Sequence, residues 1–139
     1  MAIVMRLAQP SDNNFIMNSY LRSYRNSPEN EDILNDFYFA GQTRILDKIR
    51  KTSNIIIACD EDTPDLIYGY AIADKGPIPT IHYVYVRYSA RKLGIAKRML
   101  KSCFPEFGDK LVTVTHKPRQ FDNLRTKFKL IYDPFTIRG

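Results

Sequence analysis

The stretch from Tyr83 to Phe104 constrains the fold of this chain more than any other. It begins at the end of a hydrophobic strand predicted over Thr80–Val86, breaks at Arg87–Ala90, and resumes as an amphipathic helix after the hexad Arg91–Ala96. A strand, a glycine-containing turn and a helix start form an anion cradle. The first-turn amides of a helix have no intrahelical acceptors, and the helix dipole makes that end electropositive. Glycine adds room, because no Cβ blocks the approach of a ligand.

The pattern Arg-x-x-Gly-x-Ala has two interpretations when it is taken alone, a phosphate cradle and an ordinary strand-to-helix turn. Residues 85–96, however, resemble motif A of the GNAT acyl-CoA N-acyltransferases, whose hallmark is Arg/Gln-x-x-Gly-x-Gly/Ala after a hydrophobic strand. Arg91, Gly94 and Ala96 fit this pattern, whereas Lys92 stands where glycine is frequent. The resemblance implies that the amides of residues 92–96 hold the pyrophosphate of acetyl-CoA, the expected cosubstrate.

The resemblance extends the expected cofactor site into the strand before the turn. In that family a distorted fourth strand offers backbone groups to the pantetheine arm, and the matching positions here are Val84 and Val86. The predicted cofactor-binding residues are Val84, Val86, Arg91, Lys92, Leu93, Gly94, Ile95 and Ala96. Lys97 and Arg98 follow on the helix, either as contacts to the phosphates of the nucleotide or as part of a solvated face.

Acyl transfer to an amine requires a base, and His82 is the predicted one, because an imidazole titrates in the neutral range. Its position relative to Arg91 is similar to that of a catalytic histidine in some arylalkylamine N-acyltransferases of the family. The alternative is a half-buried histidine hydrogen-bonded in the sheet. By strand alternation Thr80, His82, Val84 and Val86 should share one face. His116 is a further candidate for a polar contact to the cofactor.

The general acid is the weakest part of the resemblance. Many relatives carry a tyrosine in the helix before the penultimate strand, but aligning Phe128 with the usual Gly-Phe places Asn123 there. An amide cannot supply the proton, so water or another tyrosine has to do so, or catalysis is impaired. Tyr132 is close in sequence but would have to point inward.

The order of predicted elements indicates an α+β fold over residues 1–139, a single GNAT-like domain. The expected sheet is mixed, mostly antiparallel and twisted, with six or seven strands flanked by about four helices. Helices are predicted at 13–25, with Ser11 as N-cap, and at 29–51, 95–104 and 118–127. Strands are predicted at 3–8, 54–59, 66–73, 80–86, 111–115, 128–132 and 134–137.

Charge is distributed unevenly along the chain. Residues 1–86 carry 8 Lys/Arg against 11 Asp/Glu, whereas residues 87–139 carry 13 against 4. The basic half suits a polyanion such as coenzyme A. Nucleic acid, a less favoured partner, and a solvated basic face are the alternatives. Two functions follow: an N-acetyltransferase acting on a primary amine of a small molecule or protein, or a catalytically impaired GNAT-like module that binds CoA, nucleic acid or protein.

Other classes of function find little support in the sequence. No apolar run reaches the length of a membrane span, and the N-terminus lacks the pattern of a secretion signal, so a cytoplasmic monomer or homodimer is expected. Cys59 and Cys103 are the only cysteines and are expected as reduced core thiols. No metal site is expected, because no His/Cys cluster has zinc spacing and the acidic turn 60–65 lacks the ligands of a calcium loop.

Overall fold

The computed structural model of the chain describes residues 2–91, 93–117, 125 and 128–137. The strands are β1 (Ile3–Leu7), β2 (Asn54–Asp60), β3 (Ile67–Asp74), β4 (Thr80–Val86), β5 (Val112–Val114) and β6 (Leu130–Tyr132). The helices are α1 (Asn13–Tyr24), α2 (Asn35–Arg50) and α3 (Ile95–Cys103), and short 3₁₀ turns lie at Pro10–Asp12, Pro28–Asn30 and Tyr88–Ala90.

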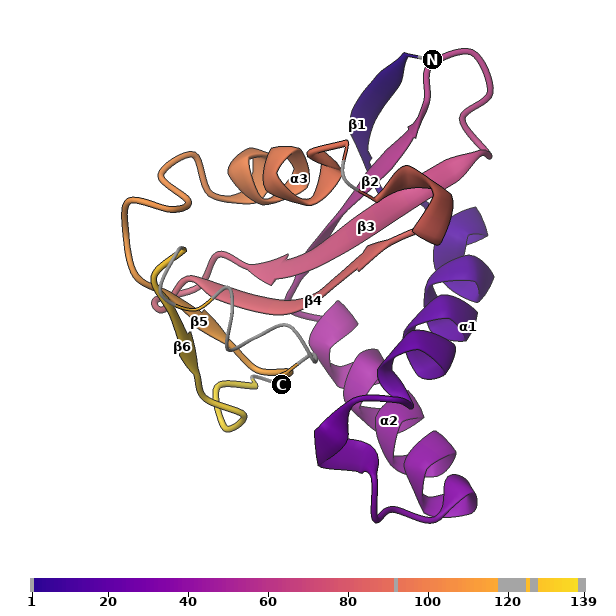
Figure 1. Cartoon of the computed structure of the whole chain (residues 1–139), viewed down its shortest axis with the longest axis vertical. Coiled ribbons are helices and arrows are strands. Elements are labelled where there is room, and N and C mark those ends of the chain that lie inside the picture. The colour runs from indigo at the N-terminus through magenta and orange to yellow at the C-terminus, as the bar shows by residue number, and fades with distance from the viewer. Residues whose placement is uncertain (1, 92, 118–124, 126–127, 138–139) are drawn as a thin grey trace.

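The six strands form one mixed sheet in the order β1-β2-β3-β4-β5-β6 (Figure 1). Strands β1 to β4 pair antiparallel, whereas β5 runs parallel to β4 and β6 runs parallel to β5. The expectation of a mixed, mostly antiparallel α+β sheet is therefore confirmed, with six strands and three α-helices in the described residues. The predicted helix 118–127 falls almost wholly outside them.

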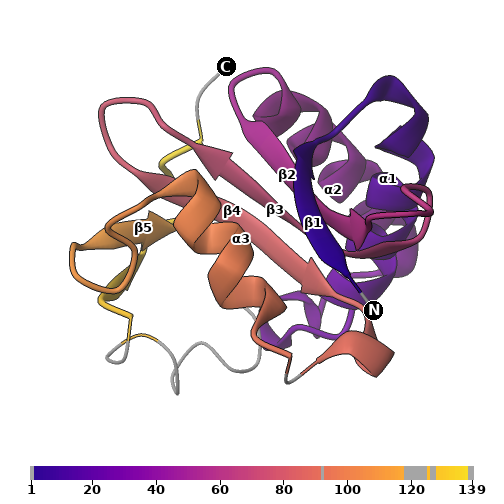
Figure 2. The same cartoon turned by 90° about the horizontal axis from the view of Figure 1, so that it is seen from above.

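Helices cover both faces of the sheet, α3 on one side and α1 with α2 on the other (Figure 2). Two hydrophobic clusters result. The cluster under α3 includes Ile95, Met99 and Cys103, and the cluster under α1 and α2 includes Ile16, Tyr20 and Leu46. Both cysteines are buried and free, as predicted. Burial of apolar area on both faces fixes the sheet as the middle layer of the domain.

A β-bulge in β4 changes which of its side chains share a face. Tyr83 pairs with Ile72, and Ile81 pairs with Ala73. His82 is therefore the extra residue that β4 inserts between these two pairs. As a result Ile81 packs in the same cluster as Val84 and Val86, although strict alternation would separate them. Ile81 thus takes the place on this face that was predicted for Thr80, so the prediction is wrong for Thr80, whereas His82, Val84 and Val86 all line one cavity.

The second helix is shorter than predicted, because the segment before it is held in a different conformation. The Arg25 guanidinium donates to the carbonyl oxygens of Asn30 and Ile33 and to the side chain of Asn35. These bonds satisfy carbonyl groups that a continuous helix would use itself. Leu34 is accordingly extended, and α2 begins at Asn35 instead of residue 29.

Two smaller predictions also differ from the structure. Ser11 is not the N-cap of α1; it lies inside the 3₁₀ turn, where Asp12 accepts the N–H of Gln9 at 2.7 Å. Residues 134–137 form no strand, because the Asp133 carboxylate accepts the N–H of Phe135 at 2.9 Å and turns the chain.

Candidate functional site

The sheet opens between β4 and β5. Their pairing covers only Thr80 with Thr113 and Ile81 with Val114, although β4 continues to Val86. A cavity of about 920 Å³ lies along the part of β4 that follows these two pairs. Its walls come from β4, the start of α3, the end of β5, the start of β6, and the end of α1 with the segment that follows it. The lining residues are 23–24, 26–27, 81–86, 90–91, 94–97 and 100, with Phe107, Val114, His116, Phe128 and Leu130.

The start of α3 forms one wall of this cavity, and its conformation requires a glycine. Gly94 is the N-cap of α3 with φ +72°, a left-handed conformation that side chains with a Cβ rarely adopt. A Cβ built at Gly94 would meet no atom within 4 Å, so the backbone faces open space. The first-turn N–H groups of α3 therefore lie at the cavity, where they can donate to an anion.

Most, but not all, of the predicted cofactor-binding residues lie at this cavity. Val84, Val86, Arg91, Gly94, Ile95 and Ala96 all line the cavity. Leu93 is 51% exposed and is not part of the lining, and Lys92 lies outside the described residues. Six of the eight predicted residues thus surround one space.

The basic residues beside the cavity differ in their availability. Arg91 is exposed, and its Nε donates to the Val86 carbonyl oxygen at 3.2 Å. Lys97 is exposed and lines the cavity. Arg98 instead donates to the carbonyl oxygen of Ile3 at 3.0 Å, on the β1 side, so of the two helix cations suggested as phosphate contacts only Lys97 reaches the cavity.

His82 and His116 both line the cavity and are linked through Thr115 (His82 1% and His116 5% exposed). The Thr115 hydroxyl lies 2.9 Å from His82 Nδ1 and 2.9 Å from His116 Nδ1. His116 Nε2 lies 2.7 Å from the hydroxyl of Tyr20 in α1. Burial, reinforced by the nearby His82, lowers the pKa of His116 from its ordinary 6.5 to about 3, so this ring is neutral at physiological pH.

Tyr24, Tyr83 and Tyr85 also line the cavity, and the sequence indicated none of them as a site residue. Tyr83 shares a hydrogen bond of 2.6 Å with Ser23, and the Tyr24 hydroxyl donates to Glu29. Burial raises the pKa of Tyr83 to about 12 and that of Tyr24 further, so both remain protonated at neutral pH. Tyr132, the tyrosine considered from the sequence, donates to Glu29 at 2.8 Å and does not line the cavity. Asn123 lies outside the described residues.

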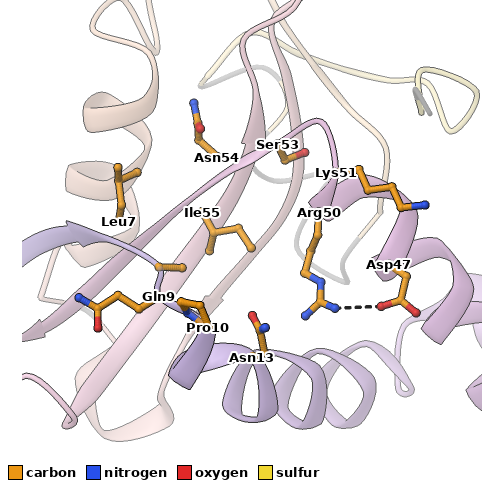
Figure 3. A pocket seen from close by; sticks show the side chains of 11 residues that line it. Leu7, Gln9, Pro10, Asn13, Asp47, Arg50, Lys51, Ser53, Asn54 and Ile55 are labelled. Atoms are coloured by element: carbon orange, nitrogen blue, oxygen red, sulfur yellow. Dashed lines mark hydrogen bonds and ion pairs between the residues drawn. The ribbon is translucent and has the colours of Figure 1, made fainter.

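A second hollow of about 720 Å³ lies at the other end of the sheet, between the ends of β1 and α2 and the start of β2 (Figure 3). Its rim carries the surface ion pair between Arg50 and Asp47, at 2.9 Å. None of the sequence-predicted site residues borders it. The described residues contain no group of three or more His, Cys, Asp or Glu side chains able to hold a metal ion. They also contain no helix with the length and apolar character needed to cross a membrane.

The fold is similar to that of many solved acetyltransferases, although no protein-family model and no curated protein matches the sequence. A protein described as histone acetyltransferase HPA2 and related acetyltransferase, from Corynebacterium glutamicum, superposes with a TM-score of 0.64 at 18% identity, covering 91% of this chain and 83% of that one. A possible acetyltransferase from Clostridium difficile gives 0.62 at 13% identity, covering 100% and 99%.

A GNAT family acetyltransferase from Brucella melitensis, solved in complex with acetyl-CoA, gives a TM-score of 0.53 at 15% identity and covers 76% and 68% of the two chains. The chain spans 66% of the length of YjaB from Escherichia coli and 63% of a GNAT family acetyltransferase from Staphylococcus aureus. At such low identities the shared property is the α+β fold alone. The chain therefore has the fold of the GNAT acetyltransferase superfamily.

Proposed function

We propose that this chain transfers the acetyl group of acetyl-CoA to a primary amine of a small molecule or a protein. The observation that carries the proposal is the opening between β4 and β5, which leads to a cavity with the glycine-capped start of α3 on its wall. Helix N–H groups and the exposed Lys97 suit a pyrophosphate, and the edge of β4 beyond its described pairs with β5 suits an extended arm with amide groups.

The residues of the cavity can supply the other requirements of the reaction. In the part of the chain that the structure describes, β4 runs through residues 83–85 beyond its pairing with β5, so backbone groups on that edge can bind and orient an extended thioester. His82 lines the same cavity and is the proposed general base for the amine. Apolar side chains of β4, β5 and β6, among them Val84, Val114 and Leu130, line the cavity, and the low local dielectric of such a lining strengthens each polar interaction with the substrate.

The reprotonation of the leaving thiolate is assigned to solvent. The tyrosines at the cavity are Tyr24, Tyr83 and Tyr85. A phenol, with an ordinary pKa of about 10, is a weaker acid than a thiol, with an ordinary pKa of about 8.5, and burial raises the pKa of Tyr24 and Tyr83 further. Proton transfer from a phenol to a thiolate would therefore be uphill. The cavity is continuous with exposed residues such as Arg91 and Lys97, along which water can enter.

Titration calorimetry with acetyl-CoA tests the binding step, with paired variants. Lys97→Ala should weaken binding by about tenfold, whereas Lys101→Ala, which removes the same charge from an exposed position of α3 outside the cavity lining, should not. Gly94→Ala should weaken binding through the Cβ and the strained backbone. Gly108→Ala imposes comparable strain, at φ +95°, outside the lining. Equal effects of each pair would contradict this binding site.

The catalytic part is tested by CoA release with a panel of amines. Turnover that requires both acetyl-CoA and an amine supports the acetyltransferase. Acetyl-CoA binding without turnover of any amine favours the alternative hypothesis, a GNAT-like module that binds the cofactor without catalysis. Absence of acetyl-CoA binding at millimolar concentration would overturn both.

A further inference from the structure

A chain of hydrogen bonds runs from α2 through α1 to the two histidines of the cavity. Gln42 Oε1 lies 2.6 Å from the Tyr20 hydroxyl, and this hydroxyl lies 2.7 Å from His116 Nε2. His116 Nδ1 and His82 Nδ1 each lie 2.9 Å from the hydroxyl of Thr115. Except for its Gln42 end, the chain is buried, so each of its protons has a defined acceptor within the protein.

The donor-to-acceptor direction of this series of hydrogen bonds is set at Gln42. A carbonyl oxygen can only accept, and 2.6 Å is the length of an O–H···O bond, so the single proton of Tyr20 goes to Gln42. The Tyr20 oxygen must then accept at its other contact. His116 Nε2 therefore carries a proton and donates to it. Because His116 is neutral, its Nδ1 is an acceptor.

The Thr115 hydroxyl has one proton for two imidazole partners, His116 and His82. It donates to His116 Nδ1, because that atom can only accept. Its oxygen must then accept from His82, which requires a proton on His82 Nδ1. A neutral imidazole has one N–H, so the lone pair of His82 is on Nε2.

We infer that the Gln42–Tyr20–His116–Thr115 chain fixes His82 in the Nδ1–H tautomer and so makes Nε2 its proton-accepting atom. Tyr20, His116 and Thr115 are positioning residues, and this role rests on the proposed acetyltransferase function. When an ammonium substrate is deprotonated, its N–H bond breaks, an Nε2–H bond forms, and the amine keeps the electron pair with which it attacks the thioester. The imidazolium still donates from Nδ1 to Thr115, so no bond of the chain has to reorient.

Nitrogen NMR of the imidazole rings tests the inference without any substrate. The full chain is prepared with ¹⁵N and without a histidine tag, because its own two histidines are then the only ones present. At about pH 8, above the ordinary histidine pKa, long-range ¹H–¹⁵N correlation should show protonated Nδ1 and bare Nε2 in His82, and the opposite in His116. The variant His116→Gln assigns the two rings. A proton on Nε2 of His82 would overturn the inference.

Two variants of Thr115 test its positioning role. Thr115→Val keeps the shape but removes the hydroxyl, and should replace the fixed tautomer of His82 by a mixture with averaged nitrogen shifts. Thr115→Ser should restore the fixed tautomer. An unchanged His82 spectrum in Thr115→Val would overturn the role. The spectrum of the unaltered protein determines the tautomer of His82, and so the direction of the hydrogen bonds, even if a variant does not fold. The expected tautomers in a protein that shows no turnover would reject the acetyltransferase proposal alone.

Discussion

Tyr132 of β6 donates its hydroxyl to Glu29 Oε2 at 2.8 Å, which joins the C-terminal strand to the segment that follows α1. The other oxygen of the same carboxylate accepts the Tyr24 hydroxyl and, at 2.8 Å, the N–H of Lys117. Ser27 adds a bond of 2.8 Å to the carbonyl oxygen of Lys117. Because Tyr24 and Ser27 line the cavity, Glu29 holds together two segments that border the site.

Replacing Glu29 by Gln should therefore loosen this side of the cavity. The amide keeps one acceptor oxygen but loses the charge, and hydrogen bonds to a charged group are about twice as strong as neutral ones. We expect the free energy of unfolding to fall by about 1 kcal/mol, measured by urea denaturation, and the affinity for acetyl-CoA to fall as well.

Glu31→Gln is the matched control, since it removes the same charge from an exposed position two residues away. If both variants lost the same stability, the effect would come from net charge, and the connecting role of Glu29 would be refuted.

The parts of this fold that could be predicted from sequence are those in which one pattern dominates locally. Apolar periodicity located α1, α3 and all six strands, and Gly94 was identified because a strand-to-helix turn with an exposed backbone requires a residue without a Cβ. The start of α2 was missed because Arg25, ten residues away from Asn35, takes over backbone carbonyls by long side-chain bonds. No local pattern encodes such a contact.

The residues of the candidate site also differ in whether the sequence predicts them. Val84, Val86, Arg91 and Gly94 follow one motif in sequence and were predicted together. Tyr24 reaches the cavity, and Thr115 reaches the ring of His82, only because the fold brings α1 and the end of β5 beside β4. The bulge at His82 was also not predictable, since a single extra residue leaves the hydrophobic pattern of the strand almost unchanged. The one sequence signal for the hydrogen bonds at the site was Thr115–His116, a hydroxyl-bearing residue followed by a histidine at a strand end.

Kinetics can compare the two partners of the hydrogen bond between His82 and Thr115 directly. His82→Gln should lower kcat by roughly two to four orders of magnitude if His82 is the general base, while the affinity for acetyl-CoA is kept. Thr115→Val should lower kcat by a smaller factor, because a fraction of His82 retains the productive tautomer. Steady-state rates with a saturating amine, together with calorimetry, separate the two effects. An unchanged kcat in His82→Gln would remove His82 from the role of base.

Two glycines are expected to respond to alanine in opposite directions. A Cβ on Gly69 of β3 would lie 2.4 Å from the carbonyl oxygen of Tyr85 and 3.2 Å from Val86 Cα, both backbone atoms of β4. Gly69→Ala should therefore destabilise the protein by about 1–3 kcal/mol. Gly41 lies within α2, where a Cβ meets only the Arg44 guanidinium at 4.0 Å, and Gly41→Ala should stabilise by about 0.5–1 kcal/mol. Thermal denaturation of both variants checks these signs, and stabilisation by Gly69→Ala would contradict the packing of β3 against β4.

The buried His116 should make the protein sensitive to mild acid. Its pKa is about 3 when folded and about 6.5 when unfolded, so between these values the unfolded chain binds the additional proton. Stability therefore decreases as the pH falls from about 6.5 towards 3, by about 1.4 kcal/mol per pH unit from this group. Asp12, whose pKa is lowered below 3.8 by its hydrogen bond to Arg6, contributes a similar loss only at more acidic pH.

Urea denaturation between pH 6 and pH 4.5 measures this slope, and His116→Gln is the variant that should reduce it. Loss of the ring changes packing and lowers stability at every pH, but it removes the proton uptake, so the dependence on pH should flatten even though the absolute free energy falls. Arg6→Lys serves as the control, because it alters the Asp12 ion pair without touching the histidine and should leave the slope in this range unchanged. Equal slopes in the unaltered protein and His116→Gln would mean that His116 is not buried as a neutral ring in solution.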